Sequence, residues 1–378
     1  MGVTSNKKLG FGLMRLPQTD PADPKSIDLA ACEKMADEFI RRGFTYFDTA
    51  WMYHEMTSEI STKKFLVERH PRETYTLATK MHSSYFNTEE ERDAYFEAQL
   101  EKTGAGYFDY YLLHDMGRDN YEKFTRLHCF EFLQQKKEEG LIRHIGFSSH
   151  EDAEHVDKFL TEHPEMEFVQ LQINYLDWDN GGVQSRLCYE AAERHGKDVV
   201  VMEPVKGGTL AKVPEEVEKM FRAYAPDRSP ASWAIRFAAS LPNVKVVLSG
   251  MSSMEQLLDN TDYMQDFTPL TEEEKEILKK AAKIIEGDIA IPCTGCSYCT
   301  NGCPQNIAIP RYFSLYNNAK ADHKEAWTPQ MEYYERATHT FGKASDCIGC
   351  GQCEAICPQH LPIIDLLKDV ADLFEAED

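Results

Sequence analysis

Short apolar runs alternate with longer amphipathic stretches from residue 9 to about residue 250. The runs are rich in β-branched and aromatic residues, which is typical of β-strands. Eight strands are predicted in this way, at Leu9–Leu13, Phe44–Asp48, Tyr75–Lys80, Phe108–His114, Ile142–Ser148, Phe168–Asn174, Val199–Glu203 and Val244–Ser249. Because most of these runs are almost continuously apolar, we expect parallel strands that are covered on both faces.

The amphipathic stretches between the runs predict helices. The clearest are Leu29–Arg41, Glu89–Lys102, Tyr121–Glu139, Val183–His195 and Ala231–Ser240, and Gly43, Gly104, Gly140 and Gly196 follow four of them as stop signals. Eight strand–helix units favour an α/β fold with a closed (β/α)₈ TIM barrel. The alternative is an open doubly wound sheet, which is weakened because no Gly-x-Gly-x-x-Gly fingerprint opens a helix after a strand.

The pattern changes near residue 270. Thr271 is followed by three glutamates, a capping signature that predicts a helix to about Glu286. Cysteine-rich sequence follows this helix. We therefore predict a barrel domain over residues 1–270, followed over residues 271–378 by a helix and a small α-rich domain that carries the clustered cysteines, whose spacing makes it ferredoxin-like as described next.

Eight of the 11 cysteines form two copies of one spacing. The first copy is Cys293, Cys296, Cys299 and Cys303 before Pro304, and the second is Cys347, Cys350, Cys353 and Cys357 before Pro358. This is the spacing of bacterial ferredoxins, in which the fourth cysteine of each copy ligates the other cluster. It predicts one [4Fe–4S] cluster on Cys293, Cys296, Cys299 and Cys357, and a second on Cys347, Cys350, Cys353 and Cys303. Zinc knuckles, the alternative, leave each third cysteine and each proline unexplained.

Charge and composition exclude several classes of partner. There are 41 Lys and Arg against 63 Asp and Glu, so the net charge is −22 and phosphate backbones and anionic lipids are repelled. We therefore expect no nucleic-acid and no membrane partner. The start of the chain has no apolar signal-like segment, and clustered cysteines indicate metal binding in a reducing compartment. A cytoplasmic location is expected.

Polar residues stand where the predicted strands end, which is where a (β/α)₈ barrel places its active site. Asp48, Lys80 and His114 end the second, third and fourth strands, and Tyr53 follows five residues after Asp48. A lysine ammonium beside a tyrosine is expected to lower the pKa of the phenol, and an aspartate would hold the lysine. The tyrosine could then protonate a carbonyl oxygen that the histidine orients.

At these residues the sequence resembles the aldo-keto reductases, over about residues 5–265. The motifs are Gly43-Phe-Thr-Tyr-Phe-Asp48-Thr-Ala, Ala78-Thr-Lys80, Asp109-Tyr-Tyr-Leu-Leu-His114, Ile142-Arg-His-Ile-Gly-Phe-Ser148, Glu203-Pro204 before Gly207-Gly208, and Ser249-Gly250. In that family an Asp–Tyr–Lys–His tetrad catalyses hydride transfer between NAD(P)H and a carbonyl, and Asp48, Tyr53, Lys80 and His114 match it. The whole chain is similar to bacterial members that carry a C-terminal ferredoxin-like domain.

The resemblance also implies the nicotinamide contacts. Ser148 and Gln170 match residues that bind the carboxamide, Met202 stands where the family stacks a tyrosine on the ring, and Asp259 and Asn260 match adenine contacts. The basic residues that hold the 2′-phosphate of NADP would fall near Gly250 and Gln256, and neither is charged. The choice between NADH and NADPH therefore stays open.

The expected function is reduction of a small-molecule carbonyl, or oxidation of the alcohol, with Tyr53 as general acid and NAD(P)H as hydride donor. The clusters would serve electron transfer, docking or structure, with a ferredoxin-like protein as a partner. One alternative is a reductase fed by ferredoxin without nicotinamide. It needs a converter between one- and two-electron steps, and a flavin is not excluded although no flavin fingerprint is found. Another alternative is a non-catalytic, nicotinamide-binding interaction subunit.

Overall fold

The computed structural model describes residues 7–20, 23–118, 120–180, 183–321 and 329–375. The chain divides into two compact units. The barrel unit comprises Met1–Asp179, Gln184–Pro204 and Ala231–Lys275, and the cysteine unit comprises Asn180–Val183, Val205–Pro230 and Glu276–Asp378. Residues 205–230 thus pack with the cysteine-bearing part of the chain, although they lie between two predicted barrel strands in the sequence.

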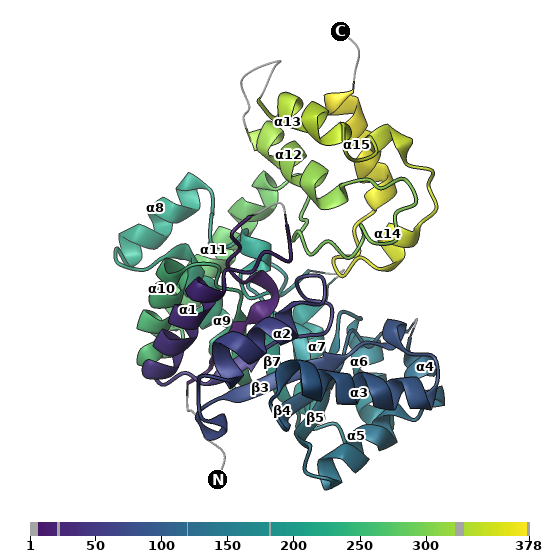
Figure 1. The fold of residues 1–378 in the computed structure, drawn as a ribbon. Helices are drawn as coiled ribbons and strands as arrows, with labels where there is room; N and C mark the ends of the chain where they lie inside the picture. Colours follow the sequence, from purple (N-terminus) through teal and green to yellow (C-terminus); the bar gives the residue numbers. More distant parts are fainter. Residues whose placement is uncertain (1–6, 21–22, 119, 181–182, 322–328, 376–378) are drawn as a thin grey trace. The chain divides into compact units, whose positions relative to one another are not determined.

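The barrel unit contains a closed barrel of eight parallel strands (Figure 1). They are β1 (Leu9–Gly12), β2 (Tyr46–Asp48), β3 (Thr76–Met81), β4 (Phe108–Leu113), β5 (Ile142–Ser149), β6 (Phe168–Gln172), β7 (Asp198–Met202) and β8 (Val244–Ser249). Each strand pairs with its neighbours in the sequence, and β1 pairs with β8 to close the sheet. The predicted (β/α)₈ barrel and all eight of its strands are confirmed.

Large side chains fill the inside of the barrel. Tyr46, Phe168 and Val246 belong to one buried cluster there, with Tyr110 packed against it. Gly10 supplies the space that they need, since a Cβ atom at this position would lie 2.7 Å from Val246 Cγ1. The interior is therefore a packed core, and the site must be built where the strands end.

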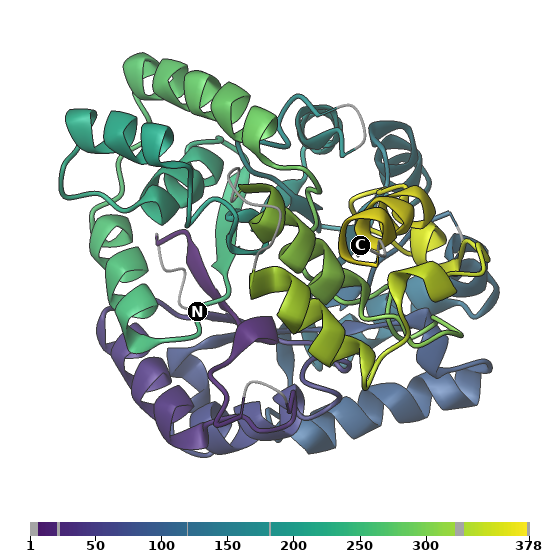
Figure 2. The same cartoon turned by 90° about the horizontal axis from the view of Figure 1, so that it is seen from above.

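Helices surround the strands of the barrel unit (Figure 2). They are α1 (Leu29–Arg41), α2 (Ser58–Thr62), α3 (Glu89–Thr103), α4 (Tyr121–Arg126), α5 (Cys129–Glu138), α6 (Ala153–Glu162), α7 (Ser185–Arg194), α9 (Pro230–Ala239) and α10 (Met254–Gln265). Gly43, Gly104, Gly140 and Gly196 all have positive φ, as their role as stop signals requires.

One predicted helix, Tyr121–Glu139, is wrong as a single element. It is interrupted at His128, whose φ is +48°, so that α4 and α5 are separate. The Arg92 guanidinium of α3 donates hydrogen bonds to the carbonyl oxygens of Leu127 and His128 at this break. A buried cation from another helix thus binds the carbonyl groups at the interruption, and the local sequence pattern does not reveal it.

The cysteine unit is helical. It contains α8 (Glu215–Tyr224), α12 (Ile309–Ala321), α13 (Pro329–Thr338), α14 (Gln352–Ala355) and α15 (Ile363–Phe374), and α11 (Glu272–Asp288) runs into it from the barrel unit. Thr271 caps α11 as predicted: its Oγ1 accepts from Glu274 N–H at 3.2 Å, and the Glu274 carboxylate accepts from Thr271 N–H at 2.8 Å. Among all the helices described, none has both the length and the apolar character needed to span a membrane.

Candidate active site

The structure brings together the four polar residues predicted at the strand ends. Asp48 is the last residue of β2, Lys80 lies in β3, His114 follows β4, and Tyr53 lies in the turn after β2. Lys80 Nζ donates to Asp48 Oδ1 at 2.5 Å and to the Thr49 carbonyl at 2.7 Å, and it lies 3.4 Å from the Tyr53 hydroxyl. The Tyr53 and His114 rings lie edge to face, with centroids 6.1 Å apart.

All four side chains are buried: Tyr53 is 9% exposed, and Asp48, Lys80 and His114 are less exposed. Burial therefore has the largest effect on their protonation. It raises the pKa of Asp48 and lowers the pKa of Lys80, and their ion pair opposes both shifts. It also lowers the pKa of His114 well below its usual value, so the imidazole is neutral near pH 7. His114 Nδ1 has no hydrogen-bond partner within the described part of the chain.

The expectation that Lys80 lowers the pKa of Tyr53 is wrong. The pKa of the phenol is raised well above 10, first by burial and then by the negative charge of Asp48. The positive charge of Lys80 would favour the phenolate, but Lys80 is ion-paired with Asp48, whose negative charge largely balances it. Tyr53 is therefore a phenol at neutral pH, which is the form that can donate a proton.

The backbone after the tyrosine is strained. His54, Glu55 and Met56 have φ between +48° and +69°, a region that residues other than glycine rarely adopt. The His54 imidazole anchors this turn: its Nε2 accepts from Leu16 N–H at 3.1 Å, and its Nδ1 bonds to the Pro24 carbonyl at 2.9 Å. The turn thus places the phenol beside β3, and nothing in the hydrophobic pattern indicated it.

Glu59 is a buried carboxylate in α2 that the sequence analysis did not identify. Its Oε1 accepts hydrogen bonds from Thr79 Oγ1 at 2.8 Å and from Gln99 Nε2 at 2.6 Å, and Gln99 also binds the Lys80 carbonyl at 3.1 Å. Burial raises the pKa of Glu59 from 4.5 to about 7. The only signal in the sequence is its place six residues after Tyr53 in a segment that was not predicted as a helix.

Replacing this carboxylate is expected to change the pH dependence of stability. The folded state holds the proton of Glu59 more tightly than the unfolded chain, so stability falls as pH rises from about 4.5 to about 7. Glu59→Gln removes this loss. We therefore expect the free energy of unfolding of the variant, relative to that of the parent, to rise by about 3 kcal/mol from pH 5 to pH 8. Denaturant unfolding at both pH values measures the difference. Exposed Glu101→Gln, in α3, is the control, and an equal gain there would contradict the assignment.

Three predicted nicotinamide contacts lie on the neighbouring strands β5, β6 and β7. Ser148 and Gln170 are paired in the β5–β6 ladder, and Met202 ends β7. Gln170 Nε2 approaches Met202 Sδ at 3.6 Å, and Gln170 Oε1 is a buried acceptor with no partner in the described ranges. Ser148 Oγ accepts from Asp115 N–H at 2.8 Å. The unpartnered Gln170 oxygen can accept a hydrogen bond from a ligand that has an amide N–H group, such as a carboxamide.

The residues predicted to contact the adenine and the 2′-phosphate differ in their exposure. Asn260 is buried, and its amide is used within the fold, since Nδ2 donates to Ser249 Oγ at 2.9 Å and Oδ1 accepts from the Tyr263 hydroxyl at 2.7 Å. Asp259 is half-buried in the same helix, α10, while Gln256 is exposed in its first turn and Gly250 is exposed directly after β8. Each polar atom of the Asn260 side chain thus has one partner within the fold and keeps one further donor or acceptor position, so its adenine contact stays a prediction.

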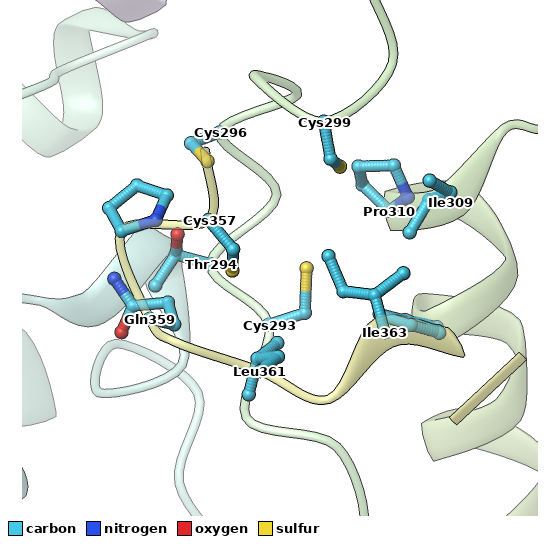
Figure 3. Close-up of a pocket in the computed structure, with 12 residues that line it drawn as sticks. Cys293, Thr294, Cys296, Cys299, Ile309, Pro310, Cys357, Gln359, Leu361 and Ile363 are labelled. Carbon is cyan, nitrogen blue, oxygen red and sulfur yellow. The ribbon is translucent and has the colours of Figure 1, made fainter. Parts of the chain in front are cut away.

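The eight clustered cysteines line two pockets of the cysteine unit. Cys293, Cys296, Cys299 and Cys357 line one pocket (Figure 3), and Cys303, Cys347, Cys350 and Cys353 line another. These are the two crossed sets that the ferredoxin spacing predicts. Isoleucine and proline side chains make up much of both linings, and Thr294 and Gln359 add polar atoms to the first, so each pocket offers four thiols within a largely apolar wall. Such a donor set suits a four-iron cluster.

Each of the two parts of the chain matches a known protein family or domain. Residues 8–283 match the aldo/keto reductase family, and residues 292–361 match the 4Fe-4S dicluster domain. The chain is 26% identical over 278 residues to the uncharacterized oxidoreductase YqkF of Bacillus subtilis (strain 168), covering 65% of this chain and 86% of that protein.

Two solved structures share the barrel. The holo form of aldo-keto reductase AKR11C1 from Bacillus halodurans is 26% identical, with a TM-score of 0.59 over 72% of this chain and 91% of that one. An aldo-keto reductase from Klebsiella pneumoniae in complex with NADPH is 18% identical, with a TM-score of 0.57 over 72% and 90%. This chain therefore belongs to the aldo/keto reductase family of oxidoreductases and carries a C-terminal 4Fe-4S dicluster domain.

Proposed function

We propose that this enzyme reduces a carbonyl substrate, or oxidises the corresponding alcohol, with Tyr53 as the general acid. The observation that carries the proposal is the buried chain from Asp48 through Lys80 to the Tyr53 hydroxyl. Because burial keeps Tyr53 as a phenol, it releases its proton only as negative charge builds on an oxygen beside it.

Lys80 and His114 complete the proton transfer. The Lys80 ammonium, 3.4 Å from the hydroxyl, stabilises the phenolate that remains, and Asp48 holds the ammonium in place. The neutral His114 imidazole has one N–H donor, which can orient the substrate oxygen. When bound, NAD(P)H supplies the hydride for the carbonyl carbon. Gln170 and Ser148 would hold its carboxamide beside Met202.

Carbonyl-dependent oxidation of the reduced nicotinamide tests this proposal. The protein is prepared anaerobically with its iron and assayed against a panel of aldehydes and ketones. We expect oxidation of the nucleotide that depends on both enzyme and carbonyl. If neither NADH nor NADPH binds, the proposal fails at the cofactor, and a ferredoxin-fed or non-catalytic role gains support.

Arg15 supports a preference for NADPH. The position that was expected to carry a cation is Gly250, and a Cβ atom built there would lie 3.3 Å from the Arg15 side chain. Ser252 Oγ also donates to the Arg15 carbonyl at 2.7 Å, which ties the segment after β1 to the loop after β8. Arg15 would therefore supply, from another part of the chain, the cation that a 2′-phosphate requires.

Arg15→Met is expected to weaken NADPH binding by about 10- to 100-fold and to leave NADH binding unchanged. The loss corresponds to a hydrogen bond to a charged group, about 1.5–3 kcal/mol. Isothermal titration of the iron-loaded protein with each nucleotide measures it. Arg194→Met, at an exposed position in α7, is the control. Equal weakening of both nucleotides would contradict a specific role for Arg15 at the phosphate.

We propose that each cysteine pocket holds one [4Fe–4S] cluster, with a protein of the ferredoxin class as one-electron partner. Cys350 is exposed, and neighbouring Ile348 is 63% exposed, so the second pocket meets the surface. A partner could approach a cluster there. Thiol-ligated clusters of this kind suit a reducing compartment, which supports a cytoplasmic location.

A further inference from the structure

A buried lysine lies beside the first cysteine pocket. Lys206 belongs to the short turn η5 (Lys206–Gly208) after β7, and only 3% of it is exposed. Its ammonium donates a hydrogen bond to Gln359 Oε1 at 3.1 Å. Gln359 follows Cys357 by two residues and lines the same pocket as Cys293, Cys296 and Cys299. The Lys206 ammonium therefore contacts a side chain that lines the predicted cluster site.

The backbone of this turn is held against the pocket wall. Lys206 and Gly207 have φ of +48° and +63°, and a Cβ atom at Gly207 would lie 2.2 Å from the Thr294 carbonyl oxygen. Thr294 is buried and lies between Cys293 and Cys296. Figure 3 shows Thr294 and Gln359 on the same side of the pocket, beside Cys357. Two residues of the pocket wall therefore contact the turn that carries Lys206.

The second pocket has a different electrostatic environment. No lysine or arginine is among the described lining residues of either pocket, so the difference lies in the cations just behind the two linings. Lys368 interacts electrostatically with Cys347 of that pocket, but its side chain is 69% exposed and paired with Asp365 at 2.8 Å. Water screens an exposed charge far more than a buried one, so the cation near the first pocket has the stronger effect.

We propose that Lys206 raises the reduction potential of the cluster held by Cys293, Cys296, Cys299 and Cys357 above that of the other cluster. Reduction adds one negative charge to a cluster, and a buried ammonium stabilises that charge. One electron then passes from the cluster on Cys303, Cys347, Cys350 and Cys353 to the first, with no bond made or broken. The electron comes from the one-electron partner of the ferredoxin class, and the inference rests on the proposed cluster sites.

Potentiometric titration of the iron-loaded protein, followed by electron paramagnetic resonance, tests this inference. In Lys206→Met we expect the ratio of reduced to oxidised first cluster, at fixed potential, to fall at least tenfold, which is 59 mV for a one-electron couple. The second cluster should not change. Lys206→Arg keeps the charge and should restore the ratio. Lys368→Met, which removes an exposed charge, should change either cluster by much less.

Three results would overturn the inference. One is a fully loaded Lys206→Met protein with both potentials unchanged, and another is an equal shift of both clusters. The third is loss of iron from Lys206→Met and Lys206→Gln but not from Lys206→Arg, which would make Lys206 structural. If the parent protein assembles no clusters, the proposed cluster sites fail first, and iron and sulfide analysis shows this before any potential is measured.

Discussion

Tyr53→Phe is expected to lower carbonyl turnover by roughly 10²- to 10⁴-fold, the usual contribution of a general acid. The substitution removes the proton donor and leaves the ring in its buried place. The nearest partner of the hydroxyl, Lys80 Nζ, is 3.4 Å away and keeps its shorter bonds to Asp48 and Thr49. Nicotinamide binding and thermal unfolding should therefore change little. The measurement is kcat with the most reactive carbonyl of the panel.

Tyr46→Phe is the matched control for this loss. Tyr46 lies in the same strand as Asp48, in the packed barrel interior, and its hydroxyl has no partner in the part of the chain that the structure covers. Full turnover is expected. A Tyr53→Phe enzyme that is as fast as the Tyr46→Phe enzyme would contradict the role of Tyr53 as general acid.

Substitution of the fourth cysteine of either motif is expected to remove the cluster of the other motif. In the crossed arrangement, Cys357 shares a pocket with Cys293, Cys296 and Cys299, whereas Cys303 lines the pocket of the second motif. Cys357→Ser and Cys303→Ser should each lose about half of the iron, because three thiolates and a serine hold a cubane poorly. Different cluster signals should remain in the two proteins. Iron and sulfide analysis with paramagnetic resonance measures both effects.

The matched control is Cys188→Ser. Cys188 is buried in α7, away from both motifs in the sequence, and its Sγ lies 3.5 Å from the Glu151 carbonyl. It should retain all of the iron. If Cys303→Ser and Cys357→Ser lost the same cluster, or lost both to the same extent, the crossed assignment would be contradicted.

The barrel could be predicted because its signals are local. Each strand is a short apolar run, and glycines such as Gly104 and Gly196 adopt the left-handed conformation that ends a helix. The interruption at His128 could not be predicted, because it depends on Arg92, which is far away in the sequence. The predicted domain boundary near residue 270 stays a prediction. The structure adds that residues 205–230 pack with the cysteine unit.

The candidate site, like the barrel, has features that the sequence could predict and features that it could not. Asp48, Lys80 and His114 could be proposed because they end strands that must be neighbours in a barrel, and the cysteines because iron–sulfur ligation requires a fixed spacing. The direction of the Tyr53 pKa shift could not be predicted. It depends on how completely the phenol is buried and on the ion pair that balances Lys80.

The sequence by itself determined the order of the elements, the spacing of the eight clustered cysteines and the polar strand ends, because these follow from periodicity and spacing along the chain. Only the tertiary structure decided the burial of Glu59, the place of Arg15 beside Gly250 and the hydrogen bond from Lys206 to Gln359. The physical reason is that burial and charge proximity depend on segments that are distant in sequence. The last two residues, for example, are 153 positions apart.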